Sequence, residues 1–117
     1  MVQQSRISLS TRGCHHMQDI TQEVVEKIAA SGVQTGVAHL FNIGSTAPLG
    51  TIEFEPGLEA DFPDMLDRLI PPSVEYGHEK TWHDGNGHSH LQASMLGPSL
   101  SIPIAQGRPV LGTWQQV

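Results

Sequence analysis

The sequence predicts an α+β domain built from short antiparallel strands and two helices. Two stretches place apolar residues three or four positions apart, which is the spacing of an amphipathic helix. The stretches between them are short, rich in β-forming residues and bounded by glycine or proline, and such strands favour antiparallel pairing. The chain has 117 residues, the usual size of one domain, so we expect a single domain over residues 1–117.

The first predicted strands flank the first helix. Residues 3–10 alternate between apolar and polar side chains, with Ile7 and Leu9 on one face, and this pattern predicts a half-buried strand. Residues 33–41 are rich in β-forming residues and predict the next strand.

The first helix is expected to begin near Asp19 or Thr21, because either side chain can cap a helix N-terminus. Its apolar stripe consists of Ile20, Val24, Val25 and Ile28. Ser31-Gly32 should end it, since glycine readily adopts the left-handed conformation found at helix C-termini.

The second half of the chain is predicted to contain one helix and four strands. Residues 49–55 predict a strand that Pro56-Gly57 ends, and Pro71-Pro72 ends the helix that follows. The apolar stripe of this helix, expected to lie in the core, consists of Leu58, Phe62, Met65, Leu66, Leu69 and Ile70. The remaining predicted strands cover residues 91–96, 100–104 and 110–117.

A histidine-rich segment is the most informative feature for function. Residues 78–90 contain four of the seven histidines, together with an aspartate and an asparagine. On a strand, His88 and His90 would face the same way, and such a cluster suits a divalent metal held by nitrogen and oxygen ligands. The alternative is a solvated loop that binds nothing, because the sequence from Asp84 to Gly87 is also typical of a turn.

Composition excludes several classes of partner. The net charge is −6 and the six basic residues do not cluster, so we expect no nucleic-acid partner. The chain has no signal-peptide pattern and no apolar run long enough to span a membrane. Cys14 is its only cysteine, which excludes an internal disulfide and fits a reducing compartment. We therefore expect a cytoplasmic protein with no membrane partner.

Two motifs lie near the C-terminus. They are the stretch Ser99–Gly107, which contains Ile-Pro-Ile, and the Gly-Thr-Trp-Gln sequence that begins at Gly112. Together they resemble the signature of the YjbQ-like family. Upstream segments agree with the family's layout, and the resemblance runs from about residue 5 to the end. These segments are Gly44-Ser45-Thr46-Ala47, the acidic residues Glu53, Glu55 and Asp61, and Tyr76-x-His78 leading to Asn86-x-x-x-His90-Leu91.

The resemblance implies a fold and an enzymatic activity, to which a non-catalytic function is the alternative. The fold is a compact, antiparallel β-sandwich-like core with two helices that forms homotrimers. Members are often labelled secondary thiamine-phosphate synthases, which couple a pyrimidine diphosphate to a thiazole phosphate and release diphosphate. The alternative is a trimeric protein that binds a metal or a small ligand without turnover. An enzyme of this kind would take a small, phosphorylated substrate.

Two departures from the family pattern bear on these expectations. Many members have a histidine where this chain has Gly44, so no role of that histidine can be transferred. Members also continue beyond the Trp-Gln motif into another strand and a basic run, whereas this sequence stops at Val117. We therefore expect that the family's last strand is missing from this chain.

The resemblance and the histidine spacing together suggest the metal ligands. His78 and His90 match fixed histidines of the family, His88 is a further candidate, and Asp84 is the carboxylate that we expect to act with them. Histidine ligands favour zinc, whereas diphosphate chemistry favours magnesium, so both divalent metals remain candidates. Asp84 is predicted either to bind the metal or to orient a histidine from behind.

The remaining candidates are catalytic or substrate-binding residues. Glu53 and Asp61 could supply a general base, although Asp61 also suits the first turn of a helix for dipole reasons alone, and Asn86 completes the predicted catalytic set.

Ser45 and Thr46 could bind an anion, or could form an ordinary turn. Trp82 could stack on a pyrimidine or thiazole ring, whereas Trp114 is expected in the core or in an interface.

Overall fold

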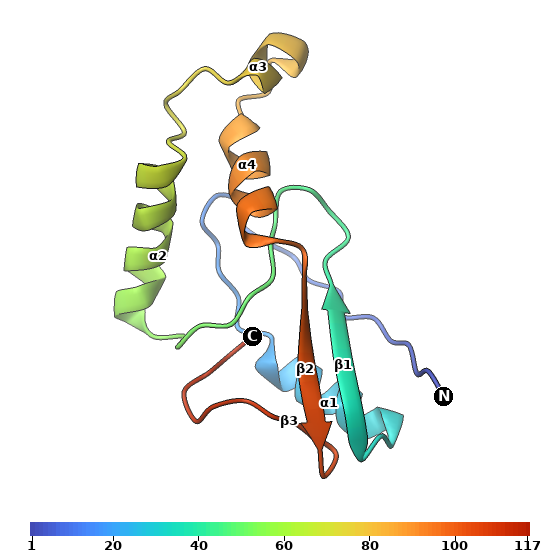
Figure 1. Ribbon diagram of the computed structural model, residues 1–117. Coiled ribbons are helices and arrows are strands. Elements are labelled where there is room, and N and C mark those ends of the chain that lie inside the picture. The colour runs from blue at the N-terminus through green and yellow to red at the C-terminus, as the bar shows by residue number, and fades with distance from the viewer. The chain divides into compact units, whose positions relative to one another are not determined.

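The computed structural model describes residues 1–117 and divides into two compact units. The first unit consists of Met1–His39, Thr51–Phe54 and Ser101–Val117, and the second of Leu40–Gly50 and Glu55–Leu100. Four helices and three strands form in the order α1 (Thr21–Ser31), β1 (Thr35–Phe41), α2 (Pro56–Leu69), α3 (Gly77–Trp82), α4 (Gly87–Leu96), β2 (Ser99–Ala105) and β3 (Arg108–Pro109) (Figure 1).

The three strands form one sheet in the order β1-β2-β3. Strands β2 and β3 pair in antiparallel fashion, with Ile104 opposite Pro109 and Ala105 opposite Arg108. The arrows of β1 and β2 also point in opposite directions in Figure 1. The predicted α+β class with an antiparallel sheet is therefore confirmed.

The structure corrects the number of sheets and helices. There is one sheet instead of a two-sheet sandwich, and four helices form instead of two. Residues 3–10 do not form a strand, and residues 49–55 and 110–117 contribute only an isolated bridge between Ile52 and Gln116. β-propensity expresses how well side chains pack on a neighbouring strand, so an alternating segment without such a partner stays irregular.

Residues 91–96, predicted as a strand, belong instead to helix α4. The sequence Leu-Gln-Ala-Ser-Met-Leu is composed largely of strong helix formers, and this preference prevailed over its apolar character. Helix α4 ends before Gly97, where the backbone φ is 90°. This correction changes which side chains of the histidine segment share a face.

Helix α1 and strand β2 supply the core of the first unit. The predicted stripe on α1 is confirmed, because Ile20, Val24 and Ile28 are buried, as are Ile102 and Ile104 of β2. The predicted end of the helix is also confirmed, because the C-cap residue Gly32 has φ 73°.

The C-terminal residue Val117 is hydrogen-bonded to the start of α1. Asp19 accepts hydrogen bonds from the amide of Thr21 at 2.9 Å and from its hydroxyl at 2.6 Å. The Thr21 hydroxyl oxygen accepts in turn from the amide of Val117 at 2.9 Å, and the amide of Ile20 donates to the Val117 carbonyl at 3.0 Å. These bonds fix the C-terminal segment against α1.

Helices α2 and α4 are joined within the second unit (Figure 1). Gln92 is buried on α4, and its amide nitrogen donates to Asp67 at 3.1 Å and to the carbonyl of Ile70 at 3.0 Å. The predicted core stripe of α2 is only partly correct, because Leu66 is buried whereas Met65 and Leu69 are exposed.

No helix in the structure combines the length and the apolar character needed to cross a lipid bilayer.

Candidate functional site

The histidine segment folds as two short helices that one carboxylate joins. Glu79 of α3 accepts hydrogen bonds from the amide of Tyr76 at 2.9 Å and from the amide of Gly87 at 2.7 Å. Tyr76 precedes α3 and Gly87 begins α4, so the two carboxylate oxygens tie the starts of both helices together. Without these bonds, both amides would lack an intrahelical partner, as the first amides of any helix do.

Gly87 lies close against the Glu79 carboxylate. A Cβ atom at this position would lie 2.7 Å from one oxygen of Glu79 and 2.8 Å from the other, so a larger residue would displace the carboxylate. Such a displacement would strain the hydrogen bond from the buried Gly87 amide.

Because Glu79 joins the starts of α3 and α4, the rings of His78 on α3 and His90 on α4 lie beside each other. Their ring centroids lie 4.6 Å apart, with the ring planes tilted by 55°. The Nδ1 atom of His90 lies 3.2 Å from the carbonyl oxygen of Ser45. Since a carbonyl only accepts, this contact requires the proton on Nδ1 and leaves Nε2 of a neutral His90 as an acceptor. This is the usual way in which proteins prepare a histidine to bind a metal.

His78 carries a buried nitrogen without a hydrogen-bond partner. Its Nε2 atom lies 3.1 Å from an oxygen of Asp84, but the direction of the contact does not suit a hydrogen bond. The side-chain oxygen of Asn86 is likewise buried and unpartnered. Buried polar atoms are nearly always satisfied, so these two atoms are candidates for contact with a ligand.

The His78–Asp84 contact fits a metal ion. Metal–nitrogen and metal–oxygen bonds of about 2.1 Å would span the observed separation at an angle of roughly 100°. The structure gathers no group of three or more His, Cys, Asp or Glu side chains around one point. The predicted set of four metal ligands is therefore not assembled. Only His78 and Asp84 of that set are close enough to share a metal ion.

His88 does not face the other histidines. In an α-helix, residues two apart point about 200° away from one another, so His88 and His90 lie on different sides of α4. The Nε2 atom of His88 lies 3.4 Å from the hydroxyl of its neighbour Ser89. The prediction that both histidines share a face was wrong because the segment is a helix and not a strand.

The turn between the helices supports both interpretations of its sequence. His83 and Gly85 have φ angles of 57° and 71°, so the segment is a genuine turn. It also delivers Asp84 to His78. Asn86 precedes α4 as its N-cap residue, yet its side chain makes no capping hydrogen bond. The amide oxygen of Asn86 is thus free for another partner.

The predicted substrate-binding residues are exposed. Ser45 contacts His90 through its backbone carbonyl and not through its hydroxyl, and Thr46 is exposed beside it. Trp82, the last residue of α3, is 69% exposed, which suits a stacking surface. Trp114 is exposed to the same extent, so of its two predicted positions the core is wrong and a subunit interface stays a prediction.

The predicted catalytic carboxylates are exposed and belong to different units. Glu53 is exposed in the first unit, and Asp61 is exposed on α2 in the second. Glu55 caps α2 instead, by accepting from the amides of Gly57 and Leu58.

Glu79 is the site residue that sequence reasoning missed. A signal was present, because Tyr76 and Glu79 have the spacing of an N-cap residue and the acidic residue of a capping box.

Most of the chain's negative charge lies in the second unit. Its basic residues are only Lys80 and Arg68. Its acidic residues are Glu55, Glu59, Asp61, Asp64, Asp67, Glu75, Glu79 and Asp84. A unit of this composition attracts cations and repels anions.

The protein is a small mixed α/β protein with an antiparallel sheet, and it carries a histidine pair on two neighbouring helices. The family description "UPF0047 protein YjbQ-like" matches residues 5–117, and the chain belongs to this family. A UPF0047 protein of Methanothermobacter thermautotrophicus is 36% identical over 99 residues, which cover 85% of this chain and 68% of that protein. The YjbQ protein of Salmonella typhimurium is 36% identical over 113 residues, covering 95% and 79% of the two chains.

Solved structures give the same result. A YbjQ-like protein of unknown function from Sulfolobus solfataricus has a TM-score of 0.86 and 32% identity, covering 92% of this chain and 77% of its own. An uncharacterized conserved protein of the YjbQ/UPF0047 family from Clostridium acetobutylicum has a TM-score of 0.77 and 36% identity, covering 85% and 74%. The predicted family is therefore confirmed.

Proposed function

We propose that this protein binds a divalent metal ion between His78 and Asp84. The observation that carries the proposal is the buried Nε2 atom of His78, which has no hydrogen-bond partner and lies 3.1 Å from a carboxylate oxygen. A metal ion would satisfy both atoms at once, and a buried polar atom left unsatisfied costs about 1–3 kcal/mol.

Two further features support the metal proposal. His90 is oriented by Ser45 so that its Nε2 atom can accept, and its ring lies beside that of His78. The second unit is also rich in carboxylates, and their field raises the local concentration of cations. Imidazole nitrogen is a ligand that zinc accepts readily and magnesium rarely, so zinc is the metal we propose first.

The reaction that we propose for the site is the thiamine-phosphate synthase reaction. A carbon–nitrogen bond forms between the methylene of the pyrimidine and the thiazole nitrogen, while the carbon–oxygen bond to diphosphate breaks. A divalent metal supplies neutralisation of the leaving diphosphate. In this proposal Trp82 stacks on a ring, and the turn at Ser45 and Thr46 lies near a phosphate. The support for this reaction is the resemblance to the family.

A non-catalytic function is the second candidate, because one observation favours it. The second unit offers diphosphate very few cations: Lys80 is exposed on α3, and Arg68 is paired with Asp64 at 2.6 Å. A protein that binds a metal or a small ligand needs no such cations. Both candidates retain the proposed homotrimer and cytoplasmic location.

Zinc titration of a His78→Ala variant tests the metal proposal. We expect zinc affinity to fall by about 100-fold or more, because loss of a direct ligand should exceed the roughly 10–100-fold effect of losing an outer partner. The measurement is calorimetric titration of metal-free protein. His88→Ala is the matched control, because His88 lies on the neighbouring helix but faces away. Equal affinities of the His78→Ala variant and the unaltered protein would contradict the proposal.

The zinc-loaded protein then separates the two functions. Synthesis of thiamine phosphate from the two phosphorylated precursors, lost in the His78→Ala variant, would support the enzyme. Zinc binding without product would leave the non-catalytic function as the better account.

A further inference from the structure

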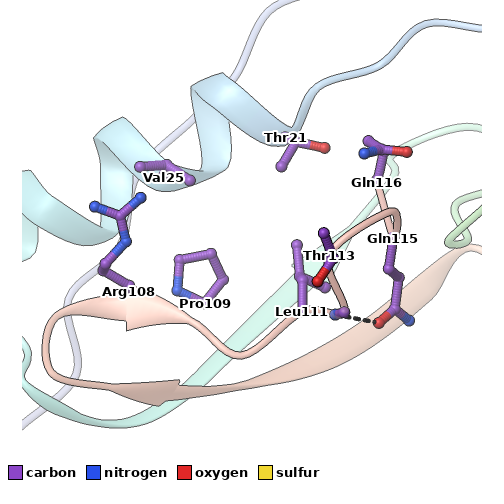
Figure 2. A pocket seen from close by; sticks show the side chains of 9 residues that line it. Thr21, Val25, Arg108, Pro109, Leu111, Thr113, Gln115 and Gln116 are labelled. Atoms are coloured by element: carbon purple, nitrogen blue, oxygen red, sulfur yellow. Dashed lines mark hydrogen bonds between the residues drawn. The ribbon is translucent and has the colours of Figure 1, made fainter. Parts of the chain in front are cut away.

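A cavity of about 210 Å³ lies in the first unit, between α1 and the segment that follows β2 (Figure 2). Its apolar wall is formed by Val25, Pro109 and Leu111, and its polar wall includes Arg108, Thr113 and Gln115. Arg108 stands at one end, beside Val25, whereas Gln115 stands at the other. The cavity is open to solvent on one side, so a ligand with a single ring can enter it.

Arg108 has a charge without a partner. The chain has 12 acidic residues, yet none forms an ion pair with this guanidinium, whereas Arg68 is paired with Asp64 at 2.6 Å. Figure 2 shows the Arg108 side chain extending from β3 toward α1, past the apolar wall. A guanidinium is a rigid, planar donor that matches the two oxygens of a carboxylate or phosphate, so this end of the cavity is suited to an oxyanion.

The polar wall of the cavity, at the end away from Arg108, is held in place by hydrogen bonds of Gln115. The side-chain oxygen of Gln115 accepts from the amide of Gly112 at 2.9 Å, and its nitrogen donates to the hydroxyl of Thr51 at 3.0 Å (Figure 2 shows the first of these). The hydroxyl of Thr113 is exposed beside them and lacks a partner, so it can donate to a ligand. A fixed wall reduces the entropy that is lost on binding.

The charge around the cavity does not repel an anion. In the first unit, the acidic residues are Asp19, Glu23, Glu26 and Glu53, and the basic side chains are Arg6, Arg12, Lys27 and Arg108. The first unit thus has equal numbers of acidic and basic side chains, in contrast to the acidic second unit. Asp19 already accepts two hydrogen bonds from Thr21 at the start of α1. The N-cap residue is nevertheless Ile20, which makes no side-chain capping bond, so the prediction that Asp19 or Thr21 caps this helix was wrong.

We propose that this cavity binds a small amphipathic oxyanion, namely a carboxylate or a phosphate on a compact apolar body. Arg108 pairs with the anion, the wall of Val25, Pro109 and Leu111 packs against the body, and Thr113 donates a hydrogen bond. The ligand is held without the histidine segment. The cavity is therefore a second site, independent of the proposed metal.

Titration of the ¹⁵N-labelled chain followed by NMR tests the proposal, with benzoate and phenyl phosphate as probes and benzyl alcohol as the neutral control. We expect shifts at the amides of Gly112, Thr113 and Gln115 with both anions. The anion that binds more tightly identifies whether carboxylate or phosphate is preferred. An Arg108→Gln variant should weaken both by at least about tenfold, because a charge-assisted hydrogen bond is lost.

An Arg68→Gln variant is the matched control, because Arg68 is the other exposed arginine of a helix or strand and should not affect binding. Circular dichroism checks that Arg108→Gln stays folded. Three results would overturn the proposal: no localised shifts, equal binding of benzyl alcohol, or unchanged anion affinity in the Arg108→Gln variant.

Discussion

Replacing Glu79 by alanine is expected to lower the free energy of unfolding by about 2–4 kcal/mol, since it removes two charge-assisted hydrogen bonds at once. The amides of Tyr76 and Gly87 would lose their acceptor, and Gly87 is buried, so water cannot easily replace the carboxylate. The starts of α3 and α4 would separate, and the His78–His90 pair would lose its fixed geometry. Urea unfolding followed by circular dichroism measures the effect.

Two comparison variants make the Glu79 experiment specific. Glu75→Ala removes an exposed carboxylate just before α3 and should change stability by no more than about 0.5 kcal/mol. Glu79→Gln keeps one acceptor oxygen and should fall between the alanine variant and the unaltered protein. If Glu79→Ala were as stable as Glu75→Ala, the carboxylate would not be the link between the helices.

Replacing Ile102 by alanine is expected to cost about 2–5 kcal/mol, the usual range for emptying a buried aliphatic site. Ile102 is only 3% exposed and lies on β2, the central strand of the sheet. The matched control is Val37→Ala, because Val37 is 66% exposed on the edge strand β1 and should cost little. Similar losses in the two variants would show that β2 is not the core strand.

Helix α1 and strand β2 could be predicted from sequence because their signals are local. Asp19 and Gly32 mark the two ends of α1, and the stripe between them has one consistent period. The segment from Leu91 to Leu96 was predicted wrongly because a short apolar run suits both a strand and a buried helix. The strand predicted for residues 3–10 was wrong for a different reason. An alternating pattern shows which face is apolar but not whether a partner strand exists.

In the candidate site, too, some residues could be predicted from local sequence signals, whereas others depend on tertiary contacts. His78, His90 and Asp84 could be selected from residue type and spacing. The structure places His90 beside His78 and Asp84 beside His78, in two separate pairwise contacts. The sequence pattern did not reveal that a helix separates His88 from them. Nor did it reveal Glu79, whose effect depends on a bond to a glycine eight residues away. Contacts between segments of this kind are set by tertiary packing, which a single sequence does not encode in its local periodicity.

The metal content of untagged protein, measured by elemental mass spectrometry beside a His78→Ala variant, is the most direct test of the proposed metal site. We predict close to one zinc ion per chain in the unaltered protein and a large loss in the variant, because His78 is one of the two proposed ligands. Absence of metal from the unaltered protein, even after incubation with zinc, would contradict the account and would make the histidine segment a structural turn between two helices.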